Sequence, residues 1–177
     1  MSTTTRPAAN EYAPFFEGYI SLVRDEDIMA ALEGQIGDVS RALAAVPPER
    51  ERFRYAPDKW SIRELVGHFI DAERVLGYRV LCIARGDQTP LPGFDEQTYA
   101  RQSRHDEYPL IELIREFETV RSGHLLLLRH LGEAAWTRLG TANANPVSVR
   151  ALAFIMAGHV RHHLGVLQSR YQVPVGQ

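Results

Sequence analysis

Two histidines, His159 and His163, stand four residues apart in the segment from Ser148 to Tyr171. Apolar residues in this segment recur at three- and four-residue steps, which predicts a helix. Both histidines fall within its apolar stripe, about 40° apart around the axis. Because side chains at i and i+4 lie one above the other, both imidazoles can bind one metal ion. The alternative is a pair of core histidines that hydrogen-bond to their neighbours.

A third histidine, His68, lies on the apolar side of another predicted helix, between about residues 61 and 86. Ser61 is the expected N-cap, Glu64 completes a capping box, and Gly86 is the expected stop. By itself a histidine in such a position is also typical of an ordinary core residue. His162 points about 100° away from His163 and is not expected to share an ion.

Apolar periodicity predicts further helices over residues 25–45 and 110–131, and the proline pair at 47–48 ends the first of these. The connection over residues 87–109 is longer than the usual limit of ~12–15 residues for a structureless loop, so we expect it to be functional or to carry a short helical turn, for instance at 96–101. No segment shows convincing strand alternation. The prediction is an all-α four-helix bundle with a long crossover between the second and third helices, which allows those two helices to run in the same direction.

Length and composition indicate one ordinary globular domain, because the chain has 177 residues, 45% of them hydrophobic. We expect a flexible tail over residues 1–10 and a single domain over 11–177. The net charge of −2 gives no reason to expect nucleic acid or a membrane surface as a partner. The single cysteine, Cys82, excludes an intrachain disulfide, and no apolar run reaches the ~20 residues of a membrane span. These features predict a cytoplasmic protein.

The core of a bundle is a common place for a metal site built from facing helices. One histidine from the second helix and an i, i+4 pair from the fourth would supply three imidazoles and leave coordination positions open, as catalytic sites do. Neutral imidazoles suit Zn, Ni, Cu or Fe(II) and leave the ion's charge available to acidify a bound water or thiol. Asp71 and Glu64, each about one turn from His68, could orient its ring. Surface charge for Asp71 and capping for Glu64 are the favoured alternatives.

Arg121 is predicted on the inward side of the third helix, and Arg79 lies about 16 Å beyond His68 along the second. Either could bind a carboxylate of a cofactor, although an ordinary ion pair at the rim of a helix is the simpler interpretation. Phe94 and Tyr99 in the long connection could form a wall of the pocket. Cys82 lies roughly 21 Å beyond His68 along the same helix, so we expect it to be a small buried residue outside the site.

Three segments together resemble the DinB-like superfamily, which includes the bacillithiol transferases: KWSIRELVGHFIDAER, IARGDQTPLPGFDEQTY and VSVRALAFIMAGHVRHHLGVLQSRY. The resemblance extends from Tyr12 to Tyr171. It implies an up-down-down-up four-helix bundle, frequent homodimers, and a divalent metal, often nickel or zinc, held by His68, His159 and His163. Known members act with small thiols such as bacillithiol, mycothiol or glutathione, and one branch is a thiol-dependent isomerase.

The leading functional prediction is therefore a metal-dependent S-transferase that joins a low-molecular-weight thiol to a small electrophilic substrate. A metal-dependent hydrolase is the second possibility, although Glu64 is the one visible base at a fixed spacing. The third is a non-catalytic metal-binding or stress-response protein. This third possibility would be favoured if a fourth ligand such as His124 or His162 closed the metal site.

Overall fold

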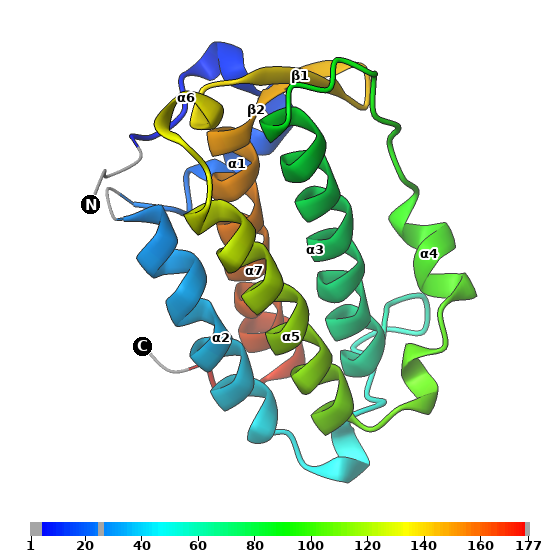
Figure 1. Ribbon diagram of the computed structural model, residues 1–177. Coiled ribbons are helices and arrows are strands. Elements are labelled where there is room, and N and C mark those ends of the chain that lie inside the picture. The colour runs from blue at the N-terminus through cyan, green and yellow to red at the C-terminus, as the bar shows by residue number, and fades with distance from the viewer. Residues whose placement is uncertain (1–4, 25–26, 176–177) are drawn as a thin grey trace.

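A computed structural model describes residues 5–24 and 27–175, and four long helices dominate it (Figure 1). These are α2 (Ile28–Ala44), α3 (Ile62–Ala84), α5 (Leu110–Arg129) and α7 (Val149–Tyr171). In the view of Figure 1, α2 and α7 run downward while α3 and α5 run upward. The bundle and its crossover agree with the prediction. None of the helices in the described ranges is long and apolar enough to cross a membrane.

Local sequence sets the ends of these helices. The Ser61 hydroxyl accepts a hydrogen bond from the Glu64 amide while the Glu64 carboxylate accepts one from the Ser61 amide, which confirms the predicted capping box. Ser148 is the N-cap of α7, where its hydroxyl accepts a hydrogen bond from the Ala151 amide. Just beyond α3, Gly86 has a φ of 83°, a conformation that glycine adopts without strain. The start predicted for α2 at 25–26 lies outside the described residues.

The apolar core has two halves separated by a polar layer. One half contains Leu32, Leu76 and Leu125, and the other contains Val39, Phe69 and Phe117, so the division crosses α2, α3 and α5 at similar heights. The polar layer links all four long helices through the following residues: Gln35 of α2, Glu73 of α3, Arg121 of α5 and the Ala157 carbonyl of α7.

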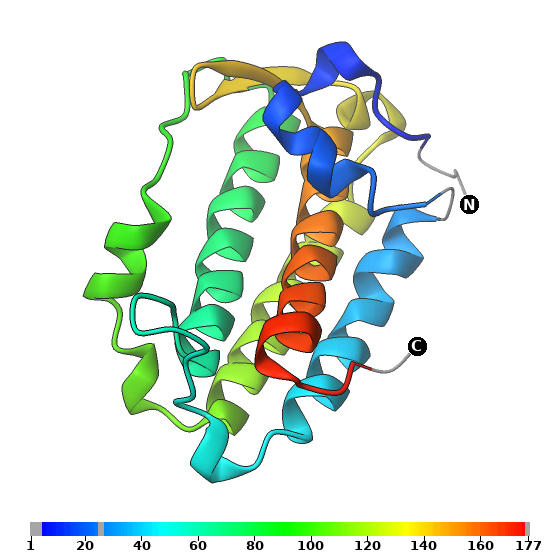
Figure 2. The ribbon, with the colours of Figure 1, turned by 180° about the vertical axis from the view of Figure 1, so that it is seen from behind.

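The N-terminal segment packs across the upper half of α7. It comprises two 3₁₀ turns, Ala9–Glu11 and Pro14–Phe16, followed by α1 (Glu17–Ile20), and it crosses α7 when the bundle is seen from behind (Figure 2). Of the predicted tail, residues 1–4 lie outside the described ranges. Thr5 and Arg6 instead contact the fold, because Thr5 accepts a hydrogen bond from Arg150 and Arg6 donates one to the Val23 carbonyl.

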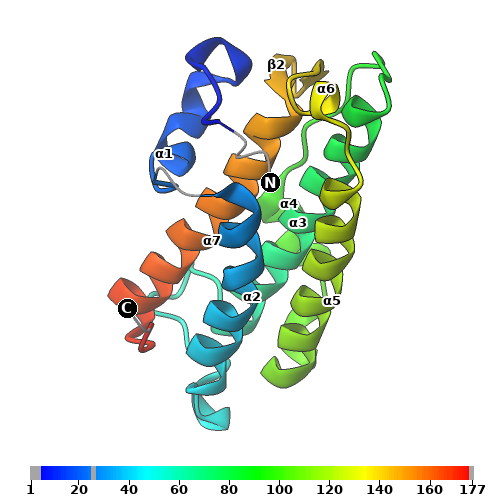
Figure 3. The same cartoon turned by 60° about the vertical axis from the view of Figure 1, so that its left-hand side comes forward.

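A short antiparallel hairpin precedes α7, where no strand was predicted. Strand β1 (Leu139–Ala142) pairs with β2 (Asn145–Ser148), and the short helix α6 (Glu133–Trp136) comes before them (Figure 3). The two turn residues, Asn143 and Ala144, have φ values of 50° and 59°. A tight hairpin needs positive φ at both positions, and the usual Asn-Gly signal is absent here. The sequence therefore looked like an irregular turn.

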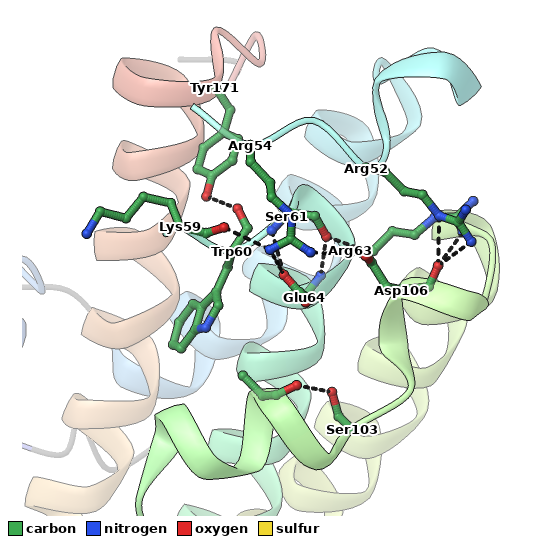
Figure 4. A network of polar contacts seen from close by, with 11 residues as sticks. Arg52, Arg54, Lys59, Trp60, Ser61, Arg63, Glu64, Ser103, Asp106 and Tyr171 are labelled. Carbon is green, nitrogen blue, oxygen red and sulfur yellow. Dashed lines mark hydrogen bonds and ion pairs between the residues drawn. The ribbon is translucent and has the colours of Figure 1, made fainter. Parts of the chain in front are cut away.

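The crossover from α3 to α5 is fastened to the lower end of the bundle. It carries α4 (Glu96–Gln102), as predicted, and then the 3₁₀ turn His105–Glu107. Within that turn Asp106 accepts hydrogen bonds from Ser61 and Arg54 through its carboxylate, and from Arg63 through its carbonyl (Figure 4). The N-terminus of α3 is thereby tied to the far end of the crossover, which keeps α4 alongside α3.

Candidate metal centre

Three imidazoles from two helices meet in the interior of the bundle. His68 of α3 and His159 and His163 of α7 are all buried, and their candidate ligand atoms lie within 4.8 Å of one another. The Nε2 atom of His159 is 3.0 Å from that of His68 and 3.1 Å from that of His163. The structure thus brings together the three histidines that the sequence singled out.

Each ring is backed by an aromatic side chain. The centroid of the Trp60 ring lies 4.8 Å from that of His68, Tyr19 lies 5.4 Å from His159, and Phe69 lies 5.4 Å from His163. These contacts limit the rotation of the imidazoles and hold their Nε2 atoms toward a common point.

The contact made by Tyr19 depends on a glycine in α7. A Cβ atom added to Gly158 would lie 2.0 Å from the Tyr19 carbonyl oxygen. Gly158 therefore allows α1 to approach α7 closely, directly beside the histidines. The role of this glycine in placing an aromatic residue on the site was not visible in the sequence.

The arrangement fits a divalent ion better than it fits hydrogen bonding among imidazoles. A ring nitrogen offers either one N–H or one lone pair, so the His159 Nε2 atom cannot form good hydrogen bonds with both neighbours. An ion bound at about 2.0–2.1 Å, with angles of about 95–110°, places its nitrogen ligands about 3.0–3.4 Å apart. The observed separations of 3.0 and 3.1 Å agree with that geometry. The three histidines can therefore hold a metal ion.

Burial also favours the neutral form that metal binding requires. Desolvation, with a smaller contribution from the other imidazoles, lowers the pKa of His68 to about 4 and that of His163 to about 2. The pKa of His159 is lowered in the same direction for the same reason. At neutral pH all three rings are thus uncharged and able to donate a lone pair.

Neither Glu64 nor Asp71 hydrogen-bonds to the ring of His68 among the described contacts, and for Glu64 the favoured capping role is confirmed. Glu64 is occupied by the cap of α3 and by Arg54, and among the described contacts Asp71 makes no hydrogen bond to His68. The Nδ1 atom of His163 is buried with no hydrogen-bond partner among the described residues. Packing on Phe69 therefore orients the His163 ring without a hydrogen bond to its Nδ1 atom in the described structure.

A cavity of about 340 Å³ opens from the histidines, and His68 and His159 form part of its wall. Phe94 lines it as predicted, whereas Tyr99 packs on Phe94 at 5.3 Å and remains outside the lining. The remaining wall is largely apolar and comes from the N-terminal segment, α3, the hairpin and α7: Phe15, Phe16, Leu76, Val147, Leu152 and Ile155. The cavity can thus receive a small organic molecule next to the imidazoles.

Glu96 is a polar residue of this site that the sequence reasoning missed. It begins α4, after the N-cap Asp95, and one of its carboxylate oxygens lies 3.9 Å from the Nε2 atom of His68. Its side chain is 54% exposed and lines the cavity. The unusual length of the crossover was the one signal that could have directed attention to it.

The two predicted cofactor-binding arginines have different surroundings. Arg79 lines the cavity, and its guanidinium donates one hydrogen bond, of 2.8 Å, to the Pro92 carbonyl. Arg121 instead belongs to the polar layer, is 0% exposed, and donates to both carboxylate oxygens of Glu73 at 2.6 and 2.9 Å. Arg121 is absent from the lining of this cavity and donates to Glu73, Gln35 and the Leu32 carbonyl, which argues against its predicted role in cofactor binding.

Two other histidines and the cysteine lie apart from the metal ligands. His124 contacts the Glu73 carboxylate through Nδ1, and His162 packs its ring against Tyr19 and His163 from the exposed side of α7. Neither belongs to the cluster that could hold a metal among the described residues. Cys82 is half-buried rather than fully buried, and it does not line the cavity.

The four-helix bundle and the three histidines beside an open cavity together are typical of a helical-bundle protein with a site that could hold a metal ion. The family model described as the DinB superfamily matches residues 31–167, and the chain belongs to that superfamily. No curated protein matched the chain in a sequence comparison.

Two solved structures share the fold at low sequence identity. One is YfiT from Bacillus subtilis, described as a "probable metal-dependent hydrolase with an unusual four-helix bundle topology". It has 15% identity and a TM-score of 0.73, and the match covers 96% of this chain and 95% of that one. The other is a mycothiol-dependent maleylpyruvate isomerase, with 15% identity and a TM-score of 0.66 over 82% of this chain and 61% of that one.

Proposed function

We propose that this protein is a metal-dependent S-transferase that uses a low-molecular-weight thiol. The observation that carries the proposal is the convergence of three neutral imidazoles, two of which, His68 and His159, line a cavity of about 340 Å³. A divalent ion held by His68, His159 and His163, nickel or zinc by the family resemblance, would supply the positive charge that makes a thiol of pKa about 8.5 nucleophilic at neutral pH.

The protein's own residues would position the reactants and manage the proton. The largely apolar wall borders the space beside the imidazoles, and Glu96 is close enough to accept the proton that a thiol releases. Because Cys82 is outside the cavity, the thiol must enter as a small molecule such as mycothiol, bacillithiol or glutathione. The fold similarity to a mycothiol-dependent isomerase supports this choice.

Hydrolysis is the second candidate, and Glu96 is the specific observation in its favour. A carboxylate 3.9 Å from the Nε2 atom of His68 could act as the general base for a water, a role for which the sequence had offered Glu64 alone. The similarity in fold to YfiT also supports it. A non-catalytic metal-binding or stress-response role has less support, since neither His124 nor His162 joins the cluster in the described structure.

Metal analysis of the untagged protein is the first test. We expect about one equivalent of nickel or zinc per chain, abolished by His159→Ala and retained in His162→Ala, which removes an imidazole from the adjacent exposed face. Retention of full metal content in His159→Ala would refute the assignment of the ligands.

Turnover then separates the two reactions. In one set of reactions the metal-loaded protein receives chlorodinitrobenzene together with mycothiol, bacillithiol or glutathione, one thiol in each reaction. In another reaction it receives a nitrophenyl ester without any thiol. Metal-dependent consumption of one thiol supports the transferase, whereas thiol-independent cleavage of the ester supports the hydrolase. Thiol consumption unchanged by removal of the metal would refute the leading proposal.

The homodimer and the cytoplasmic location stay predictions that gel filtration and fractionation can test.

A further inference from the structure

Arg79 is a buried cation without a counterion among the described residues. It is 5% exposed, and no ion pair joins it to a carboxylate within residues 5–24 and 27–175. The Pro92 carbonyl accepts one of the five N–H groups that a guanidinium offers. Burial lowers the pKa of Arg79, and no neighbouring anion counteracts that effect. A charge in this position is costly unless an anion reaches it.

Arg121 shows what a satisfied arginine looks like in the same bundle. Its guanidinium donates to the two oxygens of Glu73, to Gln35 and to the Leu32 carbonyl. Arg79 differs in two respects, because it lacks such partners and because it faces the cavity. The missing partner of Arg79 can therefore come from a molecule bound in that cavity.

We propose that the ligand of this cavity carries a carboxylate, which pairs with Arg79 while the other end of the ligand approaches the three histidines. This inference rests on the proposed function and specifies the class of molecule that the site takes. A guanidinium matches a carboxylate through two parallel hydrogen bonds. Arg79 is the one lysine or arginine in the described lining of the cavity. A single carboxylate neutralises its guanidinium, whereas a phosphate dianion would leave an excess negative charge beside it.

The shape of the cavity predicts an apolar middle for this ligand. Leu76, Leu152 and Ile155 line the wall together with the two polar ends. Both polar ends line the same cavity, and His68 and Arg79 are about 16 Å apart along the axis of α3. The ligand is therefore longer than a two- or three-carbon acid.

Calorimetric titration of the zinc-loaded protein tests the inference. The probes are ω-mercaptoalkanoates from mercaptopropionate to mercaptoundecanoate, each compared with the neutral mercaptoalkanol of equal length. We expect the acid to bind about 10- to 100-fold more tightly than the alcohol at one intermediate length. Arg79→Met should remove this preference, and Arg79→Lys should keep part of it. Arg85→Met, which alters an exposed arginine near the end of α3, should leave it unchanged.

Several outcomes would overturn the inference. Equal affinity for acid and alcohol at every length would do so, as would a preference for the acid that survives in Arg79→Met, or tighter binding of alkyl phosphates than of alkanoates. Plain alkanoates provide an arm that does not depend on sulfur. If they bind in an Arg79-dependent manner while no thiol binds, the carboxylate site stands and the transferase proposal fails. If thiols bind with the same affinity whether or not they carry a carboxylate, the carboxylate site fails and the transferase proposal stands.

Discussion

Replacing Arg121 by methionine tests the polar layer that divides the core. The Arg121 side chain is 0% exposed and its partner Glu73 is 2% exposed, so this ion pair is shielded from solvent. Burial raises the pKa of Glu73, but the Arg121 guanidinium and His124 more than offset it, and the net pKa lies below the usual value. Glu73 is therefore an ionised carboxylate that depends on its arginine.

The expected cost of Arg121→Met is about 3–5 kcal/mol, because removal of one partner leaves a buried charge without compensation. This is a large share of the stability of a typical domain, about 5–15 kcal/mol. Gln35 and the Leu32 carbonyl also lose a donor. The double variant Arg121→Met with Glu73→Leu removes both charges, so we expect it to recover most of this loss.

Urea unfolding of the metal-free protein, followed by far-UV circular dichroism, measures these free energies. Arg79→Met is the matched control, since it removes a buried guanidinium that has no carboxylate partner in the described structure, and we expect its stability to be unchanged or slightly increased. A loss below about 1 kcal/mol in Arg121→Met, or a double variant less stable than the single one, would show that the layer does not act as described.

Two further perturbations address the histidines and their support. In the metal-free protein the pKa values of His68 and His163 are lowered to about 4 and about 2, so below about pH 6.5 the unfolded chain binds more protons than the folded protein does. The free energy of unfolding should therefore decrease as the pH falls, by up to about 1.4 kcal/mol per pH unit for each imidazole. Saturating zinc should oppose this loss. Urea titrations at several pH values measure this, and a pH-independent midpoint would contradict it. Gly158→Ala should displace Tyr19 and cost about 1–3 kcal/mol in thermal unfolding, with weaker zinc binding, because the new Cβ meets the Tyr19 carbonyl at 2.0 Å. The control is Gly165→Ala, whose Cβ meets no atom within 4 Å, so this variant should be neutral or stabilising. Equal melting temperatures of the two variants would contradict the close approach of Tyr19 to Gly158.

Much of this protein could be predicted from short-range patterns. Ser61 and Glu64 cap α3 as expected, because a capping box is completed within four residues. The apolar stripes of α3 and α7 placed His68, His159 and His163 on inward faces, since helical periodicity decides which side chains point to the core. Convergence of the three imidazoles then required only that the two helices pack together.

Contacts between distant segments decided the rest. Arg121 is held by Glu73, which is 48 residues away in sequence, whereas Arg79 meets no carboxylate among the described residues and lines the cavity. Glu96 reaches His68 because Asp106 fastens the crossover against the start of α3, a closure that no local pattern announces. Sequence alone thus determined the helices and the direction in which each histidine points. The tertiary structure decided which charges are neutralised and which face the cavity, because both depend on the partners that folding brings together.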